Sequence, residues 1–250
     1  VFIIYGAFNA ERIYVNKLVK CPCNGNVSFP YNNIKTAVDH SSINDTIIVL
    51  PGKYAGNINI KNGLQIYSTN GSNETVIDCQ NKQFGLKVVN VSYLNITGFT
   101  IRDCKSDYGA GIEIKGKSNA IVRLNDMQIL NNTATRNGGG IYSEAKLVIQ
   151  NSVIYGNIAH NKGGGIMQLP NEITLSHVDI YSNEALNNTG ETLCSNDGYN
   201  ISVSGNVNIS NIKECESIIN DIVFTGTLFT TTDGIADTTT PDPTKEPTKE

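Results

Sequence analysis

One pattern of apolar residues occurs four times, at nearly equal intervals, between Leu94 and Ile180, and it constrains the fold more than any other feature of the chain. In each copy, apolar side chains fall at a first position, here called x, and at x+2, x+5 and x+7. Successive copies begin at Leu94, Val122, Leu147 and Ile173. Ser152, at x+5 of the third copy, departs from the pattern. The chain therefore contains an internal repeat.

The spacing within each copy indicates β-structure. Steps of two are typical of a strand whose alternate side chains point inward, and the gap from x+2 to x+5 indicates a bend between two strands. β-Branched residues, glycine and asparagine dominate, and the Leu-x-x-Leu-x-Leu frame of a leucine-rich repeat is missing. We therefore predict three short strands per coil, wound into a solenoid whose coils stack about 4.8 Å apart. Each residue then lies beside its equivalent in the next coil.

Two further landmarks recur in the repeat. Position x+10 is Cys104 in the first copy and asparagine in the later ones. We predict that Asn132, Asn157 and Asn183 form a buried ladder, in which amide hydrogen bonds pass from coil to coil. The glycines of segments 138–140 and 163–165 are predicted to make bends that need positive φ or close backbone approach.

These segments carry a resemblance to known proteins. Segment 132–141, with Asn-Thr-Ala and Gly-Gly-Ile, and segment 157–166, with Asn-Ile-Ala and Gly-Gly-Ile, resemble repeats of the polymorphic outer-membrane-protein type. That family has phenylalanine where this chain has Ile129, Ile154 and Ile180. Residues 34–54, with Pro-Gly-Lys-Tyr at 51–54, are similar to the opening of pectin-lyase-like β-helices. The resemblance covers roughly residues 31–212 and implies an all-β fold, a single-stranded right-handed parallel β-helix. It implies no single function, because this solenoid hosts both enzymes and adhesins.

The two ends of the chain differ from the repeats. Ile34, Ala37 and Val38 are at helical spacing, which predicts a short N-terminal helix that caps the open end of the solenoid. The apolar, uncharged residues 1–10 are predicted to be the remnant of a signal peptide, and the alternative is an apolar first strand. We predict the β-helix over residues 11–224 and a disordered stalk, rich in Thr, Pro, Lys and Glu, over residues 225–250. No stretch is long enough to span a membrane.

The six cysteines, an even number, favour an oxidising compartment. Cys79 and Cys104 are separated by one period of the repeat, which is one coil, and we predict that they form a disulfide. Cys194 and Cys215, which are separated by slightly less than one period, are predicted to pair similarly. Cys21 and Cys23 are left with two alternatives, a local bridge or a site of cross-linking. They are too close together for the usual zinc finger and have no nearby Cys or His, so we expect neither a metal nor a cofactor.

Asparagine-x-Ser/Thr sequons point to the same compartment. The chain has ten candidate N-glycosylation sites: Asn26, Asn44, Asn70, Asn73, Asn90, Asn95, Asn131, Asn187, Asn200 and Asn208. Together with the cysteines they predict a secreted or cell-surface glycoprotein. The net charge of −4, from 19 basic and 23 acidic residues, gives no basic stripe and excludes nucleic-acid binding. The expected partners are extracellular glycans or cell-surface proteins.

The sequence lacks the motifs of the β-helix enzymes. The adjacent aspartates and Gly-His-Gly of the polysaccharide hydrolases are absent. The turn from Gly52 to Tyr54 resembles that of pectin methylesterases, but Gly56 stands where that family has glutamate. An alternative lyase-like patch can be assembled from Asp78, Arg102, Asp103 and Lys105, together with Asp107 and Glu113. The favoured interpretation is that Asp78 and Asp103 hydrogen-bond to the backbone at a coil corner.

Three hypotheses of function follow. The first is a non-catalytic scaffold or adhesion glycoprotein that presents an extended face, as repeat proteins do. The second is a carbohydrate-active enzyme of the pectin-lyase-like group, a polysaccharide lyase or hydrolase that uses the acidic patch. The third is passive glycan binding by Tyr108, Tyr142, Tyr155 and Tyr181.

Overall fold

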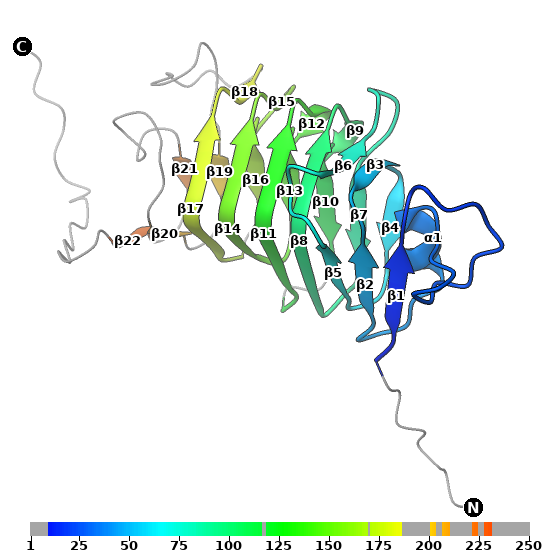
Figure 1. Cartoon of the computed structure of the whole chain (residues 1–250). Coiled ribbons are helices and arrows are strands. Elements are labelled where there is room, and N and C mark those ends of the chain that lie inside the picture. Colours follow the sequence, from blue (N-terminus) through cyan, green and yellow to red (C-terminus); the bar gives the residue numbers. More distant parts are fainter. Residues whose placement is uncertain are drawn as a thin grey trace, which may run out of the picture.

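The chain folds as a parallel β-helix, in which coil follows coil along one axis (Figure 1). This computed structural model describes residues 10–116, 119–169 and 171–186, and the backbone of the strands at 201–203, 207–210, 222–224 and 228–231. Every described strand pairs in parallel with its equivalent in the next coil. The predicted fold class is therefore confirmed.

The described strands form three sheets, and sheet C is confined to the coils from β9 to β18. Sheet A contains β1 Arg12–Val15, β2 Thr46–Val49, β3 Gly52–Ala55, β5 Gln65–Ser68, β6 Thr75–Asp78, β8 Tyr93–Arg102, β11 Ile121–Leu130, β14 Lys146–Tyr155, β17 Ile173–Tyr181, β20 Val207–Ser210 and β22 Leu228–Thr231. Sheet B contains β4 Ile58–Ile60, β7 Leu86–Val89, β10 Ile112–Lys115, β13 Ile141–Ser143, β16 Ile166–Gln168, β19 Ile201–Val203 and β21 Ile222–Phe224. Sheet C contains β9 Lys105–Tyr108, β12 Thr133–Asn137, β15 Ile158–Ala159 and β18 Glu184–Ala185.

The repeat positions lie in register from coil to coil. The four x residues pair in the order Leu94, Val122, Leu147 and Ile173, and each is fully buried. Burying an aliphatic side chain of this size contributes about 1.5–3 kcal/mol, so each coil adds its own share of the core. Ser152 fits this core because its hydroxyl is hydrogen-bonded. Its Oγ accepts from the Met127 N–H at 3.0 Å and donates to the Gln150 carbonyl at 2.6 Å.

The predicted bend after x+2 lies at a single residue, x+4. The strands β8, β11, β14 and β17 continue through it, and the residues there have φ between 48° and 85°: Gly98, Asp126, Asn151 and His177. A second left-handed residue occupies x+9 in each copy: Asp103, Asn131, Gly156 and Ser182. Glycine, asparagine and aspartate are the residues that adopt this conformation most readily. Two left-handed corners per coil therefore divide the outer surface into separate faces.

The glycine triplets provide both positive φ and close backbone approach, as the sequence predicts. Gly138 has a φ of 68°. Gly140 lies against the next coil, where an added Cβ would be 2.6 Å from the carbonyl oxygen of Gly165. A side chain at residue 140 would push the two coils apart.

The helix α1 Ile34–Asp39 lies at the N-terminal end of the β-helix, beside β4 (Figure 1). Its buried residues are the predicted Ile34, Ala37 and Val38. The Asn33 side chain caps the helix by accepting from the Thr36 N–H at 2.7 Å. The helix thus covers the start of sheet B, whose first strand is β4.

At the other end, β19 to β22 continue the pairing of sheets A and B. The strand β22 lies within the segment that the sequence assigns to the stalk. The remainder of 225–250, residues 1–9, Cys194 and Cys215 lie outside the described residues.

Candidate functional site

One outer face of sheet A lies between the two left-handed corners of each coil. Its side chains stand at x+6 and x+8, because x+5 and x+7 point into the core. At x+8 the strand register aligns Asp78, Arg102, Leu130, Tyr155 and Tyr181. We call the part of this face from Arg102 to Tyr181 the tyrosine face. Neighbouring side chains in such a row are about 4.8 Å apart.

The two tyrosines of this face form a pair. The ring centroids of Tyr155 and Tyr181 are 4.7 Å apart, and their planes are inclined by 41°. Their exposed fractions are 37% and 42%. Large aromatic side chains of this kind offer apolar surface together with a polar hydroxyl. The pair therefore presents an exposed aromatic surface.

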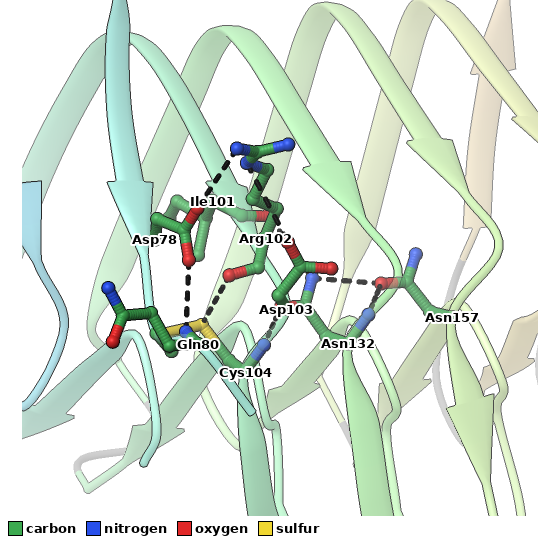
Figure 2. Close-up of a disulfide and its surroundings, with 9 residues drawn as sticks. Asp78, Gln80, Ile101, Arg102, Asp103, Cys104, Asn132 and Asn157 are labelled. Atoms are coloured by element: carbon green, nitrogen blue, oxygen red, sulfur yellow. Dashed lines mark hydrogen bonds and ion pairs between the residues drawn. A yellow bond between two sulfur atoms is a disulfide. The ribbon is translucent and has the colours of Figure 1, made fainter. Parts of the chain in front are cut away.

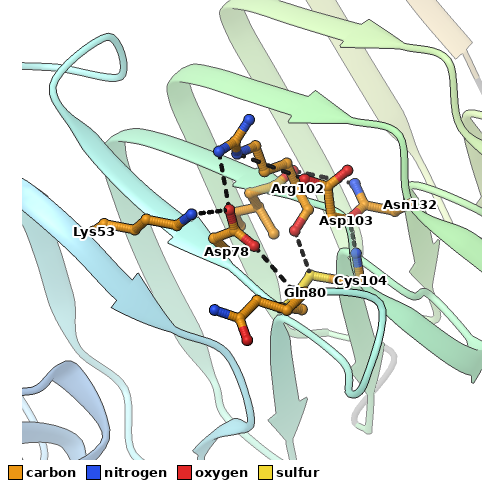
Figure 3. Close-up of polar contacts among 9 residues, drawn as sticks. Lys53, Asp78, Gln80, Arg102, Asp103, Cys104 and Asn132 are labelled. Carbon is orange, nitrogen blue, oxygen red and sulfur yellow. Dashed lines mark hydrogen bonds and ion pairs between the residues drawn. A yellow bond between two sulfur atoms is a disulfide. The ribbon is translucent and has the colours of Figure 1, made fainter.

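A charged cluster around Asp78 is drawn in Figure 3, and it shares Arg102 with the tyrosine face. The Asp78 carboxylate accepts from Lys53 Nζ at 2.7 Å and Arg102 Nη2 at 2.9 Å, both on Oδ2. Its Oδ1 accepts from the Gln80 backbone N–H at 2.9 Å. Burial acts to raise the pKa of Asp78, but the Lys53 and Gln80 hydrogen bonds and the charge of Arg102 outweigh it and lower this pKa. Asp78 is therefore an ionised carboxylate with both oxygens in contact with donors.

The alternative catalytic residues are only partly brought together. Arg102 Nε lies 3.7 Å from the Asp103 carboxylate, so both residues join the Asp78 cluster (Figure 2). Lys105 lies beyond the corner, exposed on β9. Asp107 instead accepts from the Thr135 hydroxyl at 2.6 Å. The corner thus separates the predicted patch into different faces.

Glu113 belongs to yet another face, the outer surface of sheet B. Its buried carboxylate pairs with Lys87 at 2.8 Å and with Lys115.

The Lys115 ammonium also lies 4.9 Å from the centroid of the Tyr108 ring, which packs against Tyr142 at 5.1 Å. Burial, and after it the nearby charge of Glu144, raises the pKa of Tyr142 to about 12. The four predicted tyrosines therefore form two separate pairs.

A pocket of about 350 Å³ opens beside Asp78, and no sequence motif predicts it. Three lysines line it: Lys17, Lys53 and Lys82. Asp78 is the one carboxylate among the lining residues. The lysines come from the N-terminal loop, from β3 and from the loop after β6. No local sequence pattern therefore predicts that they lie close together. The pocket carries a net positive charge and suits an anionic group.

The Asn ladder runs beside this cluster (Figure 2). Asn132, Asn157 and Asn183 are fully buried. Asn132 Nδ2 donates to Asn157 Oδ1 at 2.9 Å, and Asn157 Nδ2 donates to Asn183 Oδ1 at 2.8 Å. Each Oδ1 also accepts a backbone N–H from the preceding coil, as Asn157 does from Asn132 at 3.0 Å.

The ladder ends at a disulfide. Cys79 and Cys104 are joined across adjacent coils, with a Cα–Cα distance of 4.7 Å. The Cys104 N–H donates to Asn132 Oδ1 at 3.0 Å. A glycine lies against the disulfide and another against the ladder amide. An added Cβ at Gly85 would lie 3.3 Å from Cys104 Sγ, and one at Gly111 would lie 3.1 Å from Asn132 Nδ2. The bridge therefore occupies the position that the amides occupy in later coils.

The remaining predicted residues are distributed over the surface. Cys21 and Cys23 form a local disulfide. Six sequon asparagines are exposed: Asn26, Asn44, Asn70, Asn73, Asn90 and Asn131. Asn95 is half-buried on β8, Asn208 is on β20, and Asn187 and Asn200 lie outside the described residues. No sequon asparagine occupies x+6 or x+8 in β8, β11, β14 or β17.

The described residues include neither a metal-binding cluster nor a membrane-spanning helix. No group of three or more His, Cys, Asp or Glu side chains there is placed to hold a metal ion. No helix in this part of the chain has the length and apolar character that crossing a membrane requires.

Comparison with known proteins agrees with this architecture. Residues 126–144 match the Chlamydia polymorphic membrane protein repeat. This segment includes the end of β11, the ladder residue Asn132 and the glycine triplet that ends at Gly140. No curated protein sequence matches the chain.

Two solved structures resemble the chain to different degrees, and the first shares its fold. The pectate lyase Pel9A superimposes with a TM-score of 0.53 at 15% identity, covering 88% of this chain and 62% of its own. A pectin methylesterase variant in complex with a hexasaccharide gives a TM-score of 0.45 at 12% identity, covering 90% of this chain and 71% of its own. The chain thus spans less than two thirds of the pectate lyase, and the likeness shows the fold alone.

Proposed function

We propose that this protein is a non-catalytic, secreted or cell-surface β-helix glycoprotein that binds an extended glycan along its tyrosine face. The observation that carries the proposal is the register of Arg102, Leu130, Tyr155 and Tyr181, one coil apart on a single face. A row with a regular rise suits a ligand built from repeating units. Repeat proteins commonly use such extended surfaces for binding.

The charged cluster favours binding over catalysis. A general base needs a free lone pair within reach of the proton that it abstracts. Asp78 already accepts three contacts, from Lys53 and Arg102 on Oδ2 and from the Gln80 N–H on Oδ1, so about one of its four lone-pair positions remains for a proton. The lowered pKa of Asp78 also makes it a poor acid at neutral pH. These contacts suit a carboxylate that holds two cations in place beside a ligand.

The sequons and the comparisons support the proposed location and ligand class. No exposed sequon asparagine lies in the x+8 row of the tyrosine face. Asn73 accepts from Nε2 of Gln128, an x+6 residue of β11, at 2.7 Å, so a glycan at Asn73 would border this face. The matched repeat takes its name from a membrane protein of Chlamydia. The lyase that shares the fold is named for pectate, which makes an acidic polysaccharide the first ligand to test. The lysine-lined pocket offers positive charge at the end of the row.

The test is a screen of the purified chain against neutral and acidic polysaccharides, with binding and cleavage measured together, with and without calcium. The double variant Tyr155→Ala/Tyr181→Ala should weaken binding about tenfold or more, or by about 1.4 kcal/mol. The matched control is Tyr67→Ala, which removes an equally exposed tyrosine, at 38%, from the other side of the x+4 corner. Equal losses in both variants would contradict the proposed face.

The enzymatic alternative is decided by the same screen. New unsaturated or reducing ends would show a polysaccharide lyase or hydrolase. In that case Arg102→Ala, which removes a cation from the Asp78 cluster, should abolish turnover and leave the fold intact. Binding without cleavage supports the proposal made here.

A further inference from the structure

The two disulfides of the described chain differ in their surroundings. Cys79 and Cys104, with exposed fractions of 1% and 0%, lie between two coils of the core. Cys21 is exposed and Cys23 is half-buried, in the loop between β1 and α1. The first bridge joins cysteines with a sequence separation of 25, and the second joins cysteines with a separation of 2. One bridge is therefore sealed from solvent, and the other faces it.

The short bridge has little structural purpose. A disulfide stabilises mainly by restricting the unfolded chain, and this effect grows with the length of the closed loop. Only Pro22 lies between Cys21 and Cys23, so their bridge closes a very short loop. Residues 20–23 also make no hydrogen bond to any other described residue. Opening the bridge would release this segment and leave the coils unchanged.

The loop also carries charge that attracts anions. Lys20 precedes Cys21 directly, and Lys17 lies shortly before it on the same loop. No acidic residue occurs between Glu11 and Asp39. Thiolates are the attacking and leaving groups of disulfide exchange, and neighbouring lysines favour them. The sequence around the bridge thus suits an incoming anionic sulfur.

We propose that Cys21 and Cys23 form a thiol–disulfide exchange site, which accepts a thiol from outside the protein. An external thiolate attacks the exposed Cys21 Sγ, the bond between Cys21 and Cys23 breaks, and Cys23 leaves as a thiolate that takes a proton from water. The product is a mixed disulfide at Cys21, and no other oxidant is consumed. Attack by Cys23 on that mixed disulfide reverses the step. This proposal is independent of glycan binding.

The test exposes the native full chain to increasing reduced glutathione, traps free thiols by alkylation and maps each cysteine by mass spectrometry. Cys21 and Cys23 should react on the order of tenfold faster than Cys79 and Cys104, because they are exposed. The thermal midpoint should not change when this bridge alone is opened. Equal rates for the two bridges would overturn the proposal, and so would unfolding on selective reduction.

Two variants and a second thiol sharpen the test. Cys23→Ser removes the resolving thiol and should trap a stable mixed disulfide on Cys21 when glutathione disulfide is added; an inert Cys21 would count against the site. Lys20→Gln should slow exchange and leave the thermal midpoint unchanged, and an unaltered rate would count against an exchange site that attracts thiolates. A cysteine-bearing peptide that reacts faster than glutathione identifies a protein thiol as the partner. A faster reaction with glutathione identifies a small thiol.

Discussion

Replacing Asn157 by alanine tests what holds the coils in register. Its side chain makes four hydrogen bonds in a fully buried position. Nδ2 donates to the Ile129 carbonyl and to Asn183 Oδ1, both at 2.8 Å. Oδ1 accepts from the backbone N–H of Asn132 at 3.0 Å and from its Nδ2 at 2.9 Å. At about 1 kcal/mol for each bond, we expect Asn157→Ala to lower the free energy of unfolding by about 4 kcal/mol.

Equilibrium unfolding in urea measures this loss. Hydrogen exchange adds a local readout, because the Asn132 N–H loses its acceptor and should exchange faster. The matched control is Asn125→Ala, which also removes an Asn–Asn bond of 2.8 Å between adjacent coils, but at an exposed position. Water replaces that bond, so the control should lose less than about 1 kcal/mol. If both variants lose the same free energy, the ladder is not a stabilising element and the reasoning is refuted.

Three other predictions concern stability. The pair Cys79→Ala/Cys104→Ala should cost about 3–4 kcal/mol in urea unfolding, and the pair Cys79→Asn/Cys104→Asn should cost less, because amides there extend the ladder; equal costs would disprove that equivalence. Gly140→Ala should lower the free energy of unfolding by about 2 kcal/mol, since its Cβ would meet the Gly165 carbonyl at 2.6 Å; an unchanged thermal midpoint would contradict this. The lowered pKa of Asp78 means that its charge stabilises the fold above about pH 4 and that this contribution is lost as the pH falls. Asp78→Asn should therefore be less stable than the parent at pH 7, with the difference shrinking toward pH 2; a difference that grows in acid would reverse the sign.

The repeat and the ladder position follow from the sequence because both depend on phase within a coil. Parallel stacking places every residue beside its equivalent one period away, so Leu94 meets Val122 and Asn132 meets Asn157. The same rule brings Cys79 to Cys104. In a solenoid, the repeat period therefore predicts most of the contacts between neighbouring coils.

The composition of the candidate site did not follow in the same way. Arg102 and Lys105 are near neighbours in sequence, yet the left-handed corner at Asp103 and the ladder position at Cys104 lie between them and place them on sheets A and C. Lys17 and Lys82 are far apart in sequence and line one pocket, because the N-terminal loop returns to the side of β3 and β6. Loop paths of this kind have no period, so the repeat pattern does not encode them.

The sequence by itself thus determined the period, the buried positions and the neighbours along the axis, because these depend on alternation and stacking alone. The tertiary structure decided which charges meet across the coil, which tyrosines pair, and which disulfide faces solvent. Those outcomes depend on the angle at each corner and on the path of each loop, and both arise only when the coils are packed together.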